Sequence, residues 1–143
     1  PVLVASTASL DELNARLQTK GEAAVDMRRF RANVVLGHSD VPHANEVMPH
    51  DEDRISTLTL HALADTPRDT VQLQPVKPCP RCPIPNIDPD STQSHSVVSD
   101  TLQAYRQDPR VNGALTFGMN CVPVSGVGQV LRVGQRVSAD WVF

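Results

Sequence analysis

The sequence predicts an α+β fold: a mainly antiparallel, β-barrel-like sheet with two or three short helices. Many short runs rich in aliphatic and β-branched residues are separated by proline and glycine turns, as in antiparallel sheet proteins. Two segments carry helix signals. With 143 residues, 40% of them hydrophobic, the chain is long enough for one domain with a core and short for two. We therefore expect a single domain over residues 1–143.

The expected strands are recognised by apolar content or by alternation. Residues 23–37 (AAVDMRRFRANVVLG) alternate, with Val25 and Met27 on one side and Phe30 and Val34 on the other. The complete set of expected strands is 1–6, 23–37, 56–63, 70–76, 115–124, 128–134 and 135–143.

Two helices are expected from their end signals. In residues 8–21 (ASLDELNARLQTKG), Ser9 is the expected N-cap, the glutamate three positions later completes a capping box, and Gly21 ends the helix. A second helix is expected over residues 99–108 (SDTLQAYRQD), with Ser99 as its cap.

Residues 38–54 contain two prolines, three histidines and an acidic run, and are expected to form a long surface loop. Within this loop we expect the side chains of Asp51, Glu52 and Asp53 to be solvated. A turn is expected around Pro67.

Composition argues against several classes of partner. The formal net charge is −3 and the basic residues are scattered apart from Arg28, Arg29 and Arg31, so no nucleic acid partner is expected. No apolar run approaches the ~18 residues of a membrane span, and no signal peptide is visible, so no membrane partner is expected. Three cysteines, an odd number, favour a reducing cytoplasm. Because the chain begins at Pro1 without Met, we expect a fragment of a longer protein.

The segment KPCPRCPIPNIDPDST, residues 77–92, places Cys79 and Cys82 three positions apart among five prolines. A structural zinc site would need two further ligands, and only His38 and His43 lie at a suitable spacing. A thioredoxin-like dithiol would need a helix directly after the second cysteine, which the following prolines oppose. Both interpretations therefore have weak support.

Two other interpretations of this segment remain. The cysteines can be a buried pair in a rigid turn, or one of them can be a single thiolate ligand for a soft metal. In the second case the prolines restrict the loop, and Arg81 next to Cys82 favours the deprotonated sulfur. Asp88 and Asp90 are expected to end the loop in a turn through side-chain to backbone hydrogen bonds. Composition leaves all four interpretations open.

Two motifs carry a resemblance to a known family. Residues 27–33 (MRRFRAN) are similar to an arginine-rich RFRPN segment, with Ala32 in place of proline. Residues 77–82 (KPCPRC) and 88–92 (DPDST) are similar to K-x-C-x-R-C … D-P-x-T-G, with Gln93 in place of glycine. These segments are typical of the MOSC family, named from the C-terminal part of the molybdenum cofactor sulfurase. The likeness is to the branch that includes the mitochondrial amidoxime reducing component and its bacterial relatives.

This resemblance implies that the chain binds a molybdenum cofactor. In such proteins the second cysteine of the motif, here Cys82, binds molybdenum and is the catalytic residue. By resemblance Arg29, Arg31 and Asn33 hold the pterin and its phosphate, and Arg81 completes the cofactor-binding set. Guanidinium groups form paired hydrogen bonds with phosphate oxygens, and an amide can donate to and accept from a pterin edge, so these residue types suit the role.

The implied reaction is oxygen-atom transfer that reduces a small N-hydroxylated substrate. The implied partners are an N-terminal β-domain of the same protein and a separate electron-donor protein, since the chain has no four-cysteine iron–sulfur set. Without that domain the chain is expected to hold the cofactor poorly.

Other functions remain open. One is a sulfur carrier, in which Cys82 or Cys79 holds a persulfide. The others are a cofactor-binding module without turnover and a structural domain of a larger enzyme. Pyridoxal phosphate enters only by family association, because Lys20 and Lys77 are the only lysines and neither is placed like a Schiff-base residue.

Overall fold

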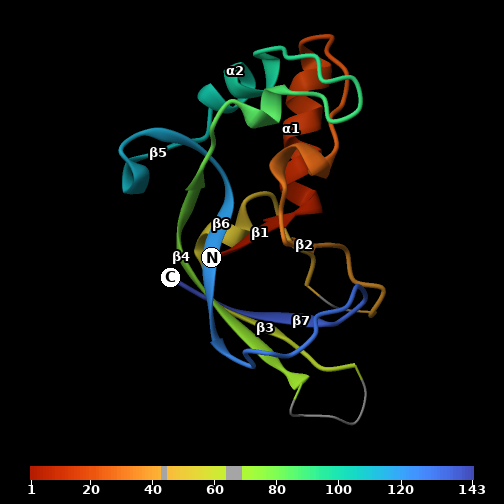
Figure 1. The fold of residues 1–143 in the computed structure, drawn as a ribbon, viewed down its shortest axis with the longest axis vertical. Coiled ribbons are helices and arrows are strands. Elements are labelled where there is room, and N and C mark those ends of the chain that lie inside the picture. The colour runs from red at the N-terminus through yellow and green to blue at the C-terminus, as the bar shows by residue number, and fades with distance from the viewer. Residues whose placement is uncertain (43–44, 64–68) are drawn as a thin grey trace.

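The computed structural model describes residues 1–42, 45–63 and 69–143. Within them, seven strands form one sheet in the order β2-β1-β6-β4-β3-β7, with β5 paired to β6 (Figure 1). The strands are β1 (Val2–Ser6), β2 (Val34–Leu36), β3 (Ile55–Leu60), β4 (Val71–Pro80), β5 (Gln107–Asp108), β6 (Ala114–Ser125) and β7 (Val137–Trp141). The α-helices are α1 (Thr7–Thr19) and α2 (Val97–Gln103). The 3-10 helices are η1 (Met27–Phe30), η2 (Asp51–Arg54), η4 (Ile84–Asn86) and η5 (Pro109–Val111).

The sheet is mixed and curled, which corrects part of the expected fold. The β1–β2 pair is parallel because the chain returns to the sheet through α1 and η1, whereas the other strand pairs are antiparallel. In Figure 1 the long antiparallel strands β4 and β6 extend between the helical end of the molecule and the end formed by β3 and β7. The end strands β2 and β7 are not paired with each other in the described residues, so this part forms a curled sheet that does not close into a barrel. The broader α+β expectation is confirmed.

Two hydrophobic clusters stabilise this arrangement. The first lies between strands of the curled sheet and consists of Val4, Leu36, Ile55, Leu58, Leu60, Val71, Leu73, Met119 and Cys121. The second packs α1 and α2 against the sheet and consists of Ala5, Leu13, Leu17, Phe30, Val98, Leu102 and Phe117. At its centre the rings of Phe30 and Phe117 stack with centroids 3.9 Å apart. This stacking places η1 next to β6.

Both expected helices are present, but their caps differ from the expectation. Helix α1 is capped by Ser6, whose Oγ accepts a hydrogen bond from the backbone N–H of Ser9 at 3.1 Å, so Ser9 lies in the first turn. Gly21, at φ 74°, follows the end of the helix as expected. Helix α2 follows Ser96 at its N-cap, and Ser99 lies inside it. Of the described helices, none has the length and apolar character needed to cross a bilayer.

The strand expected over residues 23–37 is largely wrong. The Asp26 side chain accepts a hydrogen bond from the backbone N–H of Arg28 at 2.9 Å and caps η1. Arg31 then adopts a left-handed conformation, φ 56°, which turns the chain. Only Val34–Leu36 form a strand. The alternation of this segment therefore does not reflect extended backbone.

The other expected strands are present with shifted ends, except one. Residues 128–134 form no strand, because turns with Gly128 at φ 92° and Gly134 at φ 95° interrupt the backbone there. Strand β4 continues through Pro80 into the cysteine segment. The turn expected around Pro67 falls outside the described residues.

Candidate functional site

The cysteine motif begins on a strand and ends in a loop, which corrects the expectation of one loop from residue 77 onwards. Cys79 lies half-buried near the end of β4, and Cys82 is exposed just beyond it. Between them the backbone N–H of Arg81 donates to the carbonyl of Leu115 at 2.7 Å and continues the contact with β6. Both cysteines are free thiols. The strand therefore fixes the position of Cys82 while its sulfur remains accessible.

The loop after Cys82 closes on an aspartate turn. Asp88 Oδ1 accepts from the backbone N–H groups of Asp90 at 2.8 Å and Ser91 at 2.9 Å, which confirms the expected role of Asp88. These hydrogen bonds lower the pKa of the Asp88 carboxyl. Asp90 takes part in this turn through its backbone N–H, while its carboxylate accepts hydrogen bonds from Arg28, which lower the pKa of Asp90.

The arginine-rich segment contacts this loop directly. Arg28 forms ion pairs of 2.7 Å with both Asp26 and Asp90, and all three side chains are largely exposed. The Arg29 side chain is 14% exposed; its Nη1 donates to the carbonyl of Pro85 at 3.2 Å and its Nη2 to Asp88 at 3.3 Å. The fold thus brings together the two motifs from which the function was inferred, and Arg29 holds the cysteine loop.

The other two residues expected in the first motif have different surroundings. Arg31 is exposed, and its guanidinium has no partner in the part of the chain that the structure describes. Asn33 Oδ1 accepts from the backbone N–H of Leu3 at 2.8 Å, and the Asn33 N–H donates to the Leu3 carbonyl at 2.9 Å. Arg31 is therefore available for an anion, while Asn33 also joins β1 to the segment before β2.

Arg81 contacts Cys79, so its expected effect on the Cys82 sulfur has no support in the geometry. Its Nη1 donates to Cys79 Sγ at 3.3 Å and its Nη2 to the carbonyl of Phe30 at 2.8 Å. The guanidinium carbon lies 5.5 Å from the centroid of the Phe30 ring. Arg81 thus connects the cysteine motif to η1. A pocket of about 150 Å³ opens beside Cys82, between its loop, α2 and β6.

The donor set fits a metal held by one thiolate together with a bound cofactor. Among residues 1–42, 45–63 and 69–143 there is no group of three or more His, Cys, Asp or Glu side chains able to hold a metal. A zinc ion with four protein ligands therefore gains no support there, and His43 lies outside the described residues. One exposed thiol and one unpaired guanidinium are the groups that a metal bound to a phosphate-bearing cofactor would need from the protein.

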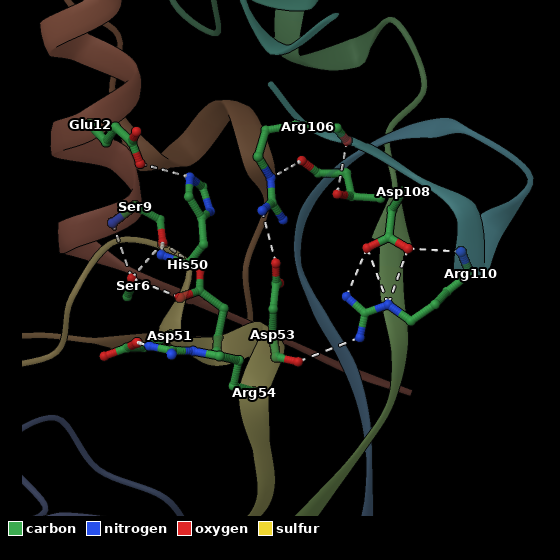
Figure 2. A network of polar contacts seen from close by, with 12 residues as sticks. Ser6, Ser9, Glu12, His50, Asp51, Asp53, Arg54, Arg106, Asp108 and Arg110 are labelled. Carbon is green, nitrogen blue, oxygen red and sulfur yellow. Dashed lines mark hydrogen bonds and ion pairs between the residues drawn. The ribbon is translucent and has the colours of Figure 1, made fainter. Parts of the chain in front are cut away.

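Sequence reasoning missed a buried polar cluster around η2 (Figure 2). Asp51 and Glu52 are 4% and 1% exposed, so the expectation that the acidic run is solvated is wrong for them. Glu52 accepts hydrogen bonds from the hydroxyls of Ser6 at 3.0 Å and Ser9 at 2.6 Å. Burial raises the pKa of Glu52. The only hint in the sequence was three consecutive acidic residues directly before a strand. Their burial becomes visible only once α1 is placed against them.

The same cluster contains an ion pair and a histidine. Arg106 Nη1 lies 2.8 Å from Asp53 Oδ2, and both side chains are nearly buried. His50 Nε2 lies 3.2 Å from Glu12 Oε2, and Figure 2 shows the His50 ring between Glu12 and Arg106. Burial, followed by the positive charge of Arg106, lowers the pKa of His50 to about 4. The cluster joins η2 to α1 and to the segment after α2.

The chain is similar to a protein named molybdenum cofactor sulfurase and to two proteins named amidoxime reducing components. It is 29% identical over 134 residues to a molybdenum cofactor sulfurase of Aspergillus terreus, covering 92% of this chain and 15% of that protein. It is 34% identical over 111 residues to the human mitochondrial amidoxime-reducing component 1, covering 76% of this chain and 27% of that protein. It is 32% identical over 143 residues to the mitochondrial amidoxime reducing component 2 of Rattus norvegicus, covering 96% of this chain and 36% of that protein.

The chain spans only 15% to 36% of the length of these relatives. The model of the MOSC domain family matches residues 1–138, which include the arginine-rich segment, the cysteine motif and the strands that carry them. Because that match extends over nearly the whole chain, this protein belongs to the MOSC domain family.

Proposed function

We propose that this chain is the molybdenum-cofactor-binding domain of an oxidoreductase that reduces N-hydroxylated compounds by oxygen-atom transfer. The observation that carries the proposal is the exposed Cys82 thiol, held at the end of β4 where the loop beyond it meets the arginine-rich segment. The names of two relatives, which describe amidoxime reduction, support this reaction class, and the name of a third supports the cofactor.

Each residue of the site has a proposed role. Cys82 is the single protein ligand of the metal, and the unpaired guanidinium of Arg31 binds the cofactor phosphate. The free amide nitrogen of Asn33 donates to the pterin. Arg29 and Arg81 bind their own chain, and therefore support the cofactor by holding the cysteine loop against η1. When bound, the cofactor supplies the oxygen-atom transfer chemistry.

The proposed partners follow from the same reasoning. These 143 residues contain three cysteines and no set of four for an iron–sulfur cluster, so electrons reach the site from outside this chain, and we propose a separate donor protein as their source. An N-terminal β-domain of the same protein completes the cofactor site, in keeping with the small share of its relatives that the chain spans. The substrate is a small N-hydroxylated compound.

Molybdenum content of matched cysteine variants tests the proposal. We expect near-stoichiometric metal, by elemental analysis, in the wild type and in Cys79→Ser when each is co-expressed with the proposed N-terminal domain in cells that synthesise the cofactor. Cys82→Ser should lose the metal, because serine removes the soft sulfur ligand. Circular dichroism confirms that the variants are folded. Metal retained in Cys82→Ser would remove Cys82 as the ligand, and metal absent from all three proteins would overturn the cofactor role.

A second candidate function is sulfur transfer. It is favoured by the exposure of the Cys82 thiol together with the similarity to a protein named molybdenum cofactor sulfurase. In this function Cys82 carries a persulfide. Intact-protein mass spectrometry distinguishes it, because a persulfide adds the mass of one sulfur atom that a reductant removes, and Cys82→Ser abolishes the addition.

A further inference from the structure

The outer edge of β7 is an open edge of the curled sheet. β7 pairs with β3 along one side and, among residues 1–42, 45–63 and 69–143, has no strand along the other. In Figure 1 it lies beside β3, at the end of the molecule away from α1 and α2. An unpaired edge presents a row of backbone N–H and C=O groups to which another strand can add.

Two backbone hydrogen bonds fix which residues of β7 face this edge. Just before the strand, the N–H of His61 donates to the carbonyl of Arg136 at 2.8 Å. Just after it, the N–H of Val142 donates to the carbonyl of Arg54 at 2.7 Å. Backbone groups of successive strand residues point to opposite edges, so the even-numbered residues from 136 to 142 face β3. The residues whose N–H and C=O groups face the outer edge are therefore Val137, Ala139 and Trp141.

The sequence protects another free edge of the sheet but not this one. β4 pairs with β3 only as far as Leu73, so in the described chain residues 74–80 have β6 as their one neighbouring strand. That half of β4 contains Pro75, Pro78 and Pro80, which have no N–H and oppose the addition of a further strand. β7, with the sequence VSADW, contains neither proline nor lysine. Its edge is therefore open to pairing.

The inward face of β7 is incompletely covered. Val137 and Ala139 pack against the first hydrophobic cluster but are only partly buried. Trp141 has the same parity in the strand and thus lies on the same face, where its side chain is 39% exposed. These side chains lie on the last strand of a sheet that does not close. A strand added along β7 would remove more of their apolar surface from water.

β7 is complementary to a second copy of itself. In an antiparallel pair centred on Ala139, Val137 lies opposite the partner's Trp141, and Ala139 lies opposite its own counterpart. These are the residues that face the edge, so each opposed pair can exchange both of its N–H···O bonds. Val137 with the partner's Trp141 is also a favourable pairing of a β-branched and an aromatic side chain. On the other face Ser138 lies opposite the partner's Asp140, so a hydroxyl donor meets a carboxylate and no two carboxylates meet.

We infer that the outer edge of β7 binds β7 of a second copy of this chain, antiparallel and centred on Ala139. The two sheets then continue into one another across a twofold axis, which is the commonest symmetry of protein dimers. The contact is independent of the metal site, because its residues lie on β7 and the cysteine motif lies at the far end of β4.

Sedimentation equilibrium of the 143-residue chain tests for the dimer. Between about 1 μM and about 1 mM protein, the mass should rise from 15.6 kDa towards twice that value. Ala139→Pro should keep the chain monomeric, because it removes an N–H that faces the edge while the hydrogen bonds to β3 come from the even-numbered residues. Circular dichroism checks that this variant is folded. A wild type that stays monomeric throughout would overturn the inference.

Two charged substitutions at one exposed position test the register. Ser138→Lys places a cation opposite the partner's Asp140 and should lower the dimer dissociation constant roughly fivefold, because each dimer contains the pair twice. Ser138→Asp opposes two carboxylates and should raise the constant by a similar factor. Both variants lose the hydrogen bond between Ser138 and His61, so the difference between them reports charge. Equal dissociation constants would overturn the pairing centred on Ala139.

Amide hydrogen exchange locates the contact. Exchange at Ala139 and Trp141 should slow as the protein concentration rises, whereas Ser138 and Asp140, which already face β3, should exchange at an unchanged rate. Repeating the measurement after co-expression with the proposed N-terminal domain distinguishes the occupants of the edge. Slow exchange at Ala139 in a protein that is then monomeric would assign the edge to that domain and overturn the dimer.

Discussion

His50 is surrounded by charged groups from three parts of the chain. Glu12 and Arg16 approach it from α1, Asp53 from η2 and Arg106 from the segment after α2. Its side chain is only 12% exposed. Removal from water and the neighbouring Arg106 charge oppose protonation more than the two carboxylates favour it, which lowers the pKa of His50 to about 4. The folded protein therefore contains a neutral His50 at pH 5.

This has a measurable effect on stability. In the unfolded chain the histidine pKa is about 6.5, so between pH 6.5 and 4 the unfolded state binds a proton that the folded state does not. The stability contributed by His50 is present above pH 6.5 and is lost as the pH falls through that window, by roughly 3 kcal/mol between pH 7 and pH 4. Urea unfolding of wild type and His50→Gln at both pH values measures it. The variant should lose roughly 3 kcal/mol less than the wild type, and parallel pH profiles would contradict the assignment.

Individual roles were predictable where a motif or local chemistry defines them. Asp88 closes its turn through local backbone N–H groups, and the sequence neighbours of an aspartate are enough to expect this. Glu52 was not predictable, because its burial depends on serines that are more than 40 residues away in the sequence. The hydrogen bond from Arg81 to the carbonyl of Phe30 was not predictable for the same kind of reason, since Phe30 lies 51 residues away on η1.

At the level of single elements, β6 contains a glycine that determines its approach to β1. Gly118 has φ 78°, and a Cβ atom there would lie 2.6 Å from the backbone carbonyl oxygen of Val4. Gly113, just before the same strand, has φ 75°, and a Cβ atom added there would have no other atom within 4 Å. Both glycines have the positive φ that disfavours other residues, but only at Gly118 would a side chain collide with β1. A comparison of the two therefore separates backbone strain from steric conflict.

We expect Gly113→Ala to cost about 1 kcal/mol, the penalty for an L-residue in the left-handed region. Gly118→Ala should cost at least about 2 kcal/mol more, because the backbone of β1 must move to accommodate the added methyl group. Chemical denaturation of both variants compares them directly. Equal losses would show that β1 and β6 are not held in close contact at Gly118.

Helices and strands were predicted correctly where the neighbouring sequence carries capping residues or a clear run of apolar residues. Helix α1 and most strands carry such signals, and errors there concern ends and caps. The segment containing η1 alternates like a strand, yet the Asp26 cap, the left-handed Arg31 and the stacking of Phe30 on Phe117 favour a tight turn. The last of these is a tertiary contact that periodicity does not report.

For the whole molecule, η2 connects the two hydrophobic clusters. Glu52 binds Ser6 at the end of β1 and Ser9 in α1, and Asp53 binds Arg106 beyond α2. These contacts hold the second hydrophobic cluster, which packs the helices against the sheet and contains Phe30, next to the first cluster, which lies between strands of the curled sheet. Because the carbonyl of Phe30 accepts from Arg81, the position of the cysteine motif depends on this connection.

Two substitutions of Glu52 test the connection. Burial raises the pKa of Glu52 above its unfolded value, so its favourable contribution is present at low pH and is lost as the pH rises through the folded pKa. Glu52→Gln keeps an oxygen acceptor without a buried charge, and should be as stable as the wild type or more stable at pH 7. Glu52→Ala removes the acceptor of two serine hydroxyls and leaves a cavity, at a cost of roughly 2–4 kcal/mol.

The form of the unfolding transition then reports how the clusters are coupled. Trp141 in β7 pairs with Ile55 at the start of β3, so its fluorescence follows the sheet, while far-UV circular dichroism also follows the helices. If η2 joins the clusters, both signals should change in one transition in the wild type and in Glu52→Gln, and should separate in Glu52→Ala as the second cluster loosens first. Coincident transitions in Glu52→Ala would show that the clusters are held together by packing alone, and the cysteine motif would then keep its position without Glu52.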